Sequence, residues 1–316
     1  MMNMTPTYKL NSDEFGALYV KREDMIPYSF GGNKARKAFH FFQDIDKGDY
    51  DYVVTYGSSH SNHCRVVANM AAARGKKCII IGPAEVSDST YNSEMMKLFG
   101  AEIITVPVDQ VSRTIDDKLD ELRKLGHNPY FILGGGHGNI GTRAYIACYQ
   151  EIKEFEKANN IFFDYIFFAS GTGTTQAGLV CGQLLEGDDR KIIGISIARK
   201  NPRGRDVVLD SIREYLGQKE FESAGISEAD IQDKTIFLDD YTGDGYGTDS
   251  IEIQDVIKKS LVMYGMPLDS TYTGKAFLGM EKYIRQNNIA DKNILFIHTG
   301  GTPLFFDDLN KFGGKG

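Results

Sequence analysis

The sequence predicts an α/β protein with two doubly wound parallel sheets, and two observations support this fold class. Short apolar runs that end in turn residues recur along the chain, as expected for strands buried on both faces. Segments with the apolar spacing of helices lie between these runs, and such alternation is typical of sheets wound on both faces by helices. The length of 316 residues is about twice that of an ordinary domain, which favours two domains.

The elements follow one another regularly. The predicted strands cover residues 52–56, 78–81, 103–106, 130–133, 165–169, 192–197, 236–238 and 294–298. The predicted helices cover residues 62–74, 113–125, 142–158, 174–185, 250–264 and 274–286. Polar segments bracket the first four strands, so we expect a smaller domain at 47–157, inserted into a larger one formed by 1–46 and 158–316. Ligands in such folds bind at the carboxyl ends of the strands.

The composition is that of an ordinary globular protein, with 41% hydrophobic and 25% charged residues. A net charge of -7 argues against nucleic acid as a partner, because nucleic-acid binders usually present a basic face. No run is long enough to span a bilayer, and the polar segment 1–13 has no apolar core of a signal peptide. We therefore expect a cytoplasmic protein that does not bind membranes.

The four cysteines predict neither a metal site nor disulfides. They are far apart and share no CxxC or Cys/His ligand spacing. Free cysteine behaves as a small apolar residue, so buried reduced thiols are expected at Cys64, Cys78, Cys148 and Cys181.

Lys34 lies directly after Gly31 and Gly32, in a segment that can approach a planar ligand closely because glycine tolerates positive φ. If the chain is helical after Asn33, Lys37 lies on the same face and its charge lowers the pKa of Lys34. A neutral amine is the nucleophile that an aldehyde cofactor needs. The alternative is a solvated basic start of a helix.

A second motif, Ser170 to Thr175, follows a predicted strand and begins a helix. Its small residues allow several backbone N–H groups to converge on an anion, and the helix N-terminus adds partial positive charge. It has neither the lysine of a P-loop nor GxGxxG spacing, so a phosphate other than that of a nucleotide is favoured. The alternative is a tight turn between strand and helix.

Three further segments carry polar groups toward the same edge. Ser61, Asn62 and His63 begin a helix after a strand and could bind a substrate carboxylate, although helix capping explains a single serine equally well. His137, in a glycine-rich turn, is either a substrate contact or structural. The loop at 239–247, which contains Tyr246, could cover a planar ligand.

Six motifs in order carry a resemblance to a known family. They are Lys21 to Asp24, Gly31 to Lys37, Ser61 to His63 with Arg65, Thr172 to Gly178, Tyr272 to Ala276, and His298 to Gly301. With these motifs the chain resembles the fold-type II pyridoxal-phosphate enzymes, whose fold is that of the tryptophan synthase β subunit. More narrowly, it is similar to the 1-aminocyclopropane-1-carboxylate deaminase and D-cysteine desulfhydrase family.

The resemblance implies roles for individual residues. Lys34 would form a Schiff base with pyridoxal 5'-phosphate, and Asn62 would meet the ring hydroxyl of that cofactor. The cofactor phosphate would be bound by Lys37, Gly171, Thr172, Gly173, Thr174 and Thr175. Small amino-acid substrates would contact Ser61, Asn62, His63, His137, Tyr246 and Tyr272, with Ser61, Tyr246 and Tyr272 as catalytic groups beside Lys34. Thr273 or Thr299 would approach the pyridine nitrogen, and the enzyme would be a homodimer.

Thr273 separates the two activities of the family. The deaminases carry glutamate there, which keeps the pyridine nitrogen protonated, whereas a hydroxyl leaves a weaker electron sink. We therefore expect α,β-elimination, with D-cysteine converted to pyruvate, ammonia and sulfide. The alternatives are cyclopropane-ring deamination, β-replacement, and a phosphate- or nucleotide-binding module without catalysis. His60 and His137 depart from the pattern of the family, which leaves the substrate open.

Overall fold

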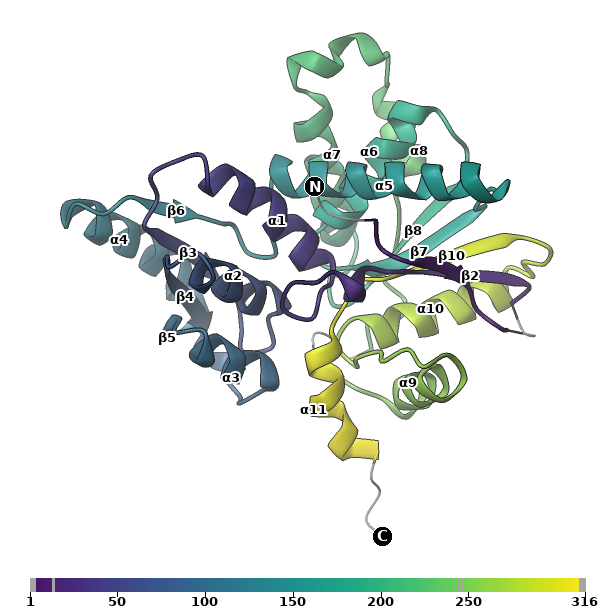
Figure 1. Ribbon diagram of the computed structural model, residues 1–316. Helices are drawn as coiled ribbons and strands as arrows, with labels where there is room; N and C mark the ends of the chain where they lie inside the picture. The colour runs from purple at the N-terminus through teal and green to yellow at the C-terminus, as the bar shows by residue number, and fades with distance from the viewer. Residues whose placement is uncertain (1–3, 13–14, 244, 246, 313–316) are drawn as a thin grey trace.

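The computed structural model describes residues 4–12, 15–243, 245 and 247–312, and it contains two sheets (Figure 1). The larger sheet has the order β1 (Thr7–Lys9), β2 (Ala17–Arg22), β10 (Asn293–His298), β7 (Tyr165–Ser170), β8 (Lys191–Ser196) and β9 (Ile236–Leu238). The smaller sheet has the order β5 (Glu102–Val106), β4 (Lys77–Pro83), β3 (Tyr52–Tyr56) and β6 (Pro129–Phe131). All strand pairs are parallel except that of β1 with β2.

Helices connect successive strands and cover the sheets (Figure 1). They are α1 (Asn33–Ile45), α2 (Asn62–Ala72), α3 (Tyr91–Leu98), α4 (Val111–Lys124), α5 (Asn139–Asn159), α6 (Thr174–Glu186), α7 (Arg203–Leu216), α8 (Glu228–Lys234), α9 (Ile251–Tyr264), α10 (Thr273–Gln286) and α11 (Thr302–Phe312). The prediction of two doubly wound sheets is thereby confirmed. None of the helices in the described part of the chain is long and apolar enough to cross a membrane.

All eight predicted strands are present, but the sequence patterns missed β1 and β2 together with α3, α7, α8 and α11. A helix after Asn33 was considered only as a condition, and the structure contains it as α1. The strand β2 escaped notice because half-buried Tyr19 and charged Lys21 and Arg22 interrupt its apolar pattern. Lys21 nevertheless is buried, since its ammonium group forms an ion pair with Glu151 of α5. The four cysteines are buried free thiols, as predicted.

The two helices next to the predicted domain boundaries cross between the sheets. Phe41, Phe42 and Ile45 of α1 pack in the core of the smaller sheet. Tyr145 and Tyr149 of α5 pack in a core with β7 and α6 of the larger sheet. A helix that follows a strand of one sheet therefore packs against the other sheet. The residue bounds of the two domains stay a prediction.

The strand orders place two topological switch points side by side. In the smaller sheet the order reverses at β3, whose neighbours are β4 and β6, and in the larger sheet it reverses at β7, between β8 and β10. Crevices at the carboxyl ends of such strands are the usual ligand sites of this architecture.

The glycine turn before α1 is tied to the end of β10. Gly32 has a φ of 95°, and a Cβ there would lie 2.8 Å from the carbonyl oxygen of Thr299. The backbone N–H of Asn33 donates to that same oxygen at 2.9 Å. Only glycine permits this conformation and this approach together, so the turn fixes the start of α1, and with it Lys34, against the larger sheet.

Candidate active site

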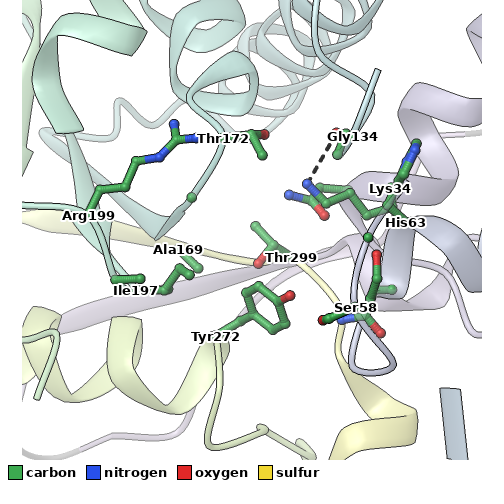
Figure 2. A pocket seen from close by; sticks show the side chains of 18 of the residues that line it. Lys34, Ser58, His63, Gly134, Ala169, Thr172, Ile197, Arg199, Tyr272 and Thr299 are labelled. Atoms are coloured by element: carbon green, nitrogen blue, oxygen red, sulfur yellow. Dashed lines mark hydrogen bonds between the residues drawn. The ribbon is translucent and has the colours of Figure 1, made fainter. Parts of the chain in front are cut away.

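A cavity of about 340 Å³ opens where the carboxyl ends of the two sheets face each other (Figure 2). Each of five strands contributes a residue from the turn that follows it, namely Ser58 after β3, Gly134 after β6, Gly171 after β7, Arg199 after β8 and Thr299 after β10. Figure 2 shows Lys34 and His63 on one side, Ile197 and Arg199 on the other, and Tyr272 between them. The cavity therefore spans both switch points.

Lys34 lines this cavity from the first turn of α1. Its ammonium group donates to the carbonyl oxygen of Gly135 at 3.3 Å, which is a long hydrogen bond. Burial lowers the pKa of Lys34 to about 8, and the positive charge of Arg199 adds to this effect. The sequence predicts that the charge of Lys37 lowers this pKa, whereas the main causes in the structure are burial and Arg199. A substantial neutral fraction near pH 8 suits a nucleophilic amine.

Lys37 lies one turn farther along α1 and is fully buried. Its ammonium group donates to the hydroxyl of Thr174 at 3.0 Å, at the start of α6. Burial lowers its pKa well below the ordinary value, and the charge of Lys34 lowers it further. Gly171 and Thr172 of the same turn line the cavity, whereas Gly173, Thr174 and Thr175 lie behind them. An anion at this helix N-terminus would meet converging backbone N–H groups and the charge of Lys37.

Ser61 and Asn62 line the opposite side of the cavity at the start of α2. The Ser61 hydroxyl accepts from the backbone N–H of Cys64 at 3.2 Å, so it is the N-cap of this helix as well as a cavity residue. The Asn62 side-chain oxygen accepts from Arg65 at 2.6 Å and from Asn92 at 3.0 Å. Arg65 can only donate, so the orientation of the Asn62 amide follows from chemistry, and its Nδ2 group is left to donate toward a ligand.

His63 is held in one tautomer. The hydroxyl of Thr55 donates to the carbonyl oxygen of Ile132 at 2.8 Å, so the same hydroxyl accepts from Nε2 of His63, also at 2.8 Å. Nδ1 then carries a lone pair, and it is buried without a hydrogen-bond partner in the described part of the chain. Burial and the charges of Lys34 and Lys37 lower the pKa of His63 well below its ordinary value. The side chain is therefore a neutral acceptor that lines the cavity.

The structure distinguishes between the two threonines proposed for the pyridine nitrogen. Thr299 lines the cavity. Thr273 is fully buried behind it, and its hydroxyl donates to the carboxylate of Asp269 at 2.7 Å. Burial raises the pKa of Asp269 to about 7, against the effect of its hydrogen bonds with Thr273.

Of the other predicted substrate residues, only one is found among the described residues that line the cavity. Tyr272 lines the cavity, at the start of α10. His137 is not among the lining residues and lies instead against the backbone of Thr172. Tyr246 lies outside the described residues. None of the described residues at 239–247 lines the cavity.

Two residues of this site were not found by the sequence argument. Arg199 lines the cavity, and its Nη1 is buried without a hydrogen-bond partner in the described structure. It lies just past β8, so the rule that sites form at strand ends could have found it. Asn92 lies on α3, which the patterns missed, and no signal in the sequence connects it to Asn62.

These residues fit pyridoxal phosphate on structural grounds. The cavity combines a half-buried lysine of lowered pKa with a helix N-terminus for a phosphate and a polar wall at Asn62 and His63. In the described part of the chain, no aspartate or glutamate lines it. Gly135 also lies so close that a Cβ there would meet Thr172 at 2.6 Å and the Lys34 ammonium at 3.3 Å. Because Gly135 has no side chain, the space between Lys34 and the turn at Thr172 stays open.

Comparison with known proteins decides the family. Residues 2–300 match the family described as pyridoxal-phosphate dependent enzyme. The chain belongs to this family. Its cofactor is pyridoxal phosphate, and it is an enzyme.

Relatives within the pyridoxal-phosphate family carry two activities in their names. A D-cysteine desulfhydrase of Yersinia pestis (strain Pestoides F) is 32% identical over 317 residues, which cover 96% of this chain and 93% of the relative. A putative 1-aminocyclopropane-1-carboxylate deaminase of Pyrococcus abyssi (strain GE5 / Orsay) is 32% identical over 300 residues, covering 93% and 88%. The crystal structure of an ACC deaminase homologue superposes with a TM-score of 0.85 at 29% identity and covers 98% of this chain and 93% of that one. The family predicted from the six motifs is confirmed.

Proposed function

We propose that this enzyme catalyses α,β-elimination on a small amino acid, with D-cysteine as the leading substrate. The observation that carries the proposal is the set of groups facing the cavity, which offers hydroxyls and cations but no carboxylate among its described residues. Thr299, rather than an acid, is then the group available to the pyridine nitrogen. A hydroxyl partner makes the ring a weaker electron sink, which suffices to expel a thiol but favours ring opening less. The names of the relatives include both activities.

The residues would divide the work as follows. Pyridoxal phosphate, when bound, withdraws electrons from the α-carbon of the substrate. Lys34 would hold the cofactor through Nζ and, when this amine is free, would take the α-proton of the substrate at the same atom. The Cα–H and Cβ–S bonds break, sulfide leaves with the bonding electrons, and the 2-aminoacrylate formed reacts with water to give pyruvate and ammonia.

The remaining site residues would bind the cofactor and the substrate, with Ser61 and Tyr272 as further catalytic groups beside Lys34. Lys37 and the turn Gly171 to Thr175 would hold the cofactor phosphate through a charge and backbone N–H groups. Ser61 and Asn62 would hold anionic oxygens at the N-terminus of α2. Tyr272 would face the substrate. The homodimeric state and the cytoplasmic location remain predictions, and size-exclusion chromatography with light scattering tests the first.

Borohydride reduction followed by peptide mapping tests the cofactor attachment. We expect the reduced cofactor on the peptide that contains Lys34, and a Lys34→Ala variant should lose activity by a factor of about 10² to 10⁴, the range for removal of a positioned proton acceptor. Release of keto acid and ammonia from D-cysteine, L-cysteine, D-serine and 1-aminocyclopropane-1-carboxylate then ranks the substrates. Turnover of the cyclopropane alone would replace the elimination proposal with deamination.

A label on another lysine, or none, would contradict the role of Lys34. If the cofactor binds at Lys34 but no amino acid of the panel releases keto acid, β-replacement becomes the better assignment. Lys76→Ala is a suitable control, because this lysine lies outside the cavity and donates to the Tyr50 backbone.

A further inference from the structure

Arg65 differs from the other buried arginines of the described structure in its electrostatic partners. Arg36, Arg65 and Arg190 are each no more than 2% exposed. Arg36 forms ion pairs with Glu23 and Glu151, and Arg190 forms ion pairs with Glu156 and Asp188. The guanidinium of Arg65 forms no ion pair with any carboxylate of the described residues, so none of these carboxylates compensates its charge.

The hydrogen bonds of Arg65 are also incomplete. Its Nη1 donates to Asn62 Oδ1 at 2.6 Å and to Asn92 Oδ1 at 2.7 Å. Its Nε and Nη2 are buried without a partner in the part of the chain that the structure describes. Burying a cation without a counter-charge is unfavourable, and the cost is accepted where a function requires the charge.

Asn92 completes the arrangement from α3. Its amide nitrogen donates to the His60 carbonyl oxygen at 3.0 Å and to Asn62 Oδ1 at 3.0 Å, while its own oxygen accepts from Arg65. These contacts determine which end of each amide is the oxygen, because Arg65 has no acceptor and the His60 carbonyl has no donor. Two donors therefore hold Asn62 Oδ1, and Asn62 can offer only its N–H groups to the cavity.

We propose that Arg65 and Asn92 are positioning residues that fix Asn62 as a donor to an anionic oxygen of the bound ligand, and that the uncompensated charge of Arg65 acts on the same oxygen. This inference rests on the proposed function. The anionic oxygen belongs either to the α-carboxylate of the amino acid or to the pyridine ring of the cofactor. Both have the same chemistry, and both would lie near Asn62 at the N-terminus of α2, where partial positive charge adds to the attraction.

The substitution Asn92→Asp separates this role from a packing role. The new carboxylate has nearly the shape of the amide and gives Arg65 a counter-charge, but it can no longer donate to Asn62 or to the His60 carbonyl. Asn62 Oδ1 then keeps only the Arg65 donor, so the Asn62 amide is held less firmly, and the charge of Arg65 is compensated inside the protein. We expect the apoprotein to unfold in urea at about the same concentration, because the new ion pair offsets the lost hydrogen bond to His60, while affinity for the ligand anion falls about 10- to 100-fold, as for loss of a charge-assisted hydrogen bond.

Three ligands identify the source of the anion. Alanine of either chirality has no β-leaving group, and ethylamine is the same molecule without the carboxylate. Their dissociation constants come from absorbance titrations of the holoenzyme, and that of pyridoxal phosphate from titration of the apoprotein. A loss for alanine with little change for ethylamine assigns the substrate carboxylate. A loss for pyridoxal phosphate itself assigns the ring oxygen.

The control is Asn69→Asp, which adds the same charge to α2 at a residue outside the cavity. Equal losses for alanine and ethylamine with unchanged cofactor affinity, or no loss beyond this control, would overturn the proposal. So would a lower urea midpoint accompanied by a general loss of binding. If Asn92→Asp does not fold, Arg65→Gln replaces it, since this variant removes the charge and should lower the affinity for the same anion. A wild-type protein with no cofactor absorbance would instead refute the proposed function.

Discussion

Arg36 and Arg65 lie on neighbouring helices and are equally buried, yet their surroundings are opposite in charge. Arg36 contacts two carboxylates, and the Glu23 carboxylate that it pairs with also accepts from Thr5 at 2.7 Å. Burial alone would raise the pKa of Glu23, but the Arg36 guanidinium outweighs it and lowers that pKa to about 2. Arg65 contacts two amide oxygens instead, and burial lowers its own pKa to about 9. The first network neutralises itself, whereas the second leaves positive charge next to Asn62, which lines the cavity.

The same contrast occurs within the first two turns of α1. Arg36 pairs with Glu23, directly after β2, and with Glu151 of α5, and it thereby links the larger sheet to α1. Lys34 and Lys37 lie on the cavity side, and neither forms an ion pair with a carboxylate of the described residues. Their hydrogen bonds go to a carbonyl and a hydroxyl. Among these four cations, Arg36 is compensated by carboxylates and connects elements of the fold, whereas Arg65, Lys34 and Lys37 lie where a ligand could supply the negative charge.

The largest effect is expected on the compensated side, from Arg36→Met. This variant leaves Glu23 as a buried charge without its main partner, and breaking such a pair costs about 3 to 5 kcal/mol of unfolding free energy. Urea unfolding of the apoprotein at neutral pH measures the loss. Arg74→Met is the matched control, because the Arg74–Asp46 pair is 30% and 45% exposed and such surface pairs contribute roughly 0 to 1 kcal/mol.

The pH dependence identifies Glu23 as the cause. In the wild type its pKa of about 2 lies below the ordinary 4.5, so its ionisation stabilises the fold above about pH 4.5 and this contribution is lost as the pH falls toward 2. The difference between wild type and Arg36→Met should therefore shrink over the same interval, where Glu23 takes up a proton. A difference that stays constant down to pH 2 would mean that Arg36 acts through packing rather than charge.

Among the cations without a carboxylate partner, Lys37→Met should lower ligand affinity but leave the stability of the apoprotein unchanged or higher. The substitution removes a buried ammonium whose partner is the Thr174 hydroxyl, so the apoprotein should keep or gain stability. The affinity for pyridoxal phosphate should fall by about 10- to 100-fold, because the phosphate loses a charge-assisted hydrogen bond. Parallel titrations with pyridoxal, which has no phosphate, should show a much smaller change. A similar loss for both compounds would remove Lys37 from the phosphate site.

The sequence predicts the large-scale arrangement well because periodicity and chemistry agree over long stretches. Apolar runs such as 165–169 and the small-residue turn after them follow from local physics, and the six ordered motifs identified the family. Which groups of the site donate hydrogen bonds and which accept them could not be predicted in the same way. That Asn92 orients Asn62, or that Thr55 selects the tautomer of His63, depends on hydrogen bonds between segments far apart in the chain. The burial of Lys21 in β2 escaped for the same reason, since its partner Glu151 lies on α5.

The smallest expected effect concerns the pKa of Lys34, which burial lowers to about 8 with a further contribution from Arg199. Below pH 8 the neutral fraction of this amine rises about tenfold per pH unit, and above it the fraction levels off. The rate at which apoprotein captures pyridoxal phosphate, followed by absorbance, should rise with pH, pass half of its maximum near pH 8 and reach a plateau above that pH. Nearby Lys37 and His63 have pKa values lowered well below their ordinary ranges, so neither should produce this transition.

Arg199→Gln tests the share of the neighbouring charge in that pKa. Removing this cation stabilises the charged form of Lys34, so the plateau should move to higher pH, toward but well short of the ordinary 10.5. Arg203→Gln is the control, because Arg203 affects the pKa of Arg199 but is not among the causes that act on Lys34. If the plateau moves to lower pH in Arg199→Gln, or moves equally in both variants, Arg199 does not act on Lys34 through its charge. The expected shift is small because burial is the larger cause, and burial comes from the fold rather than from one residue.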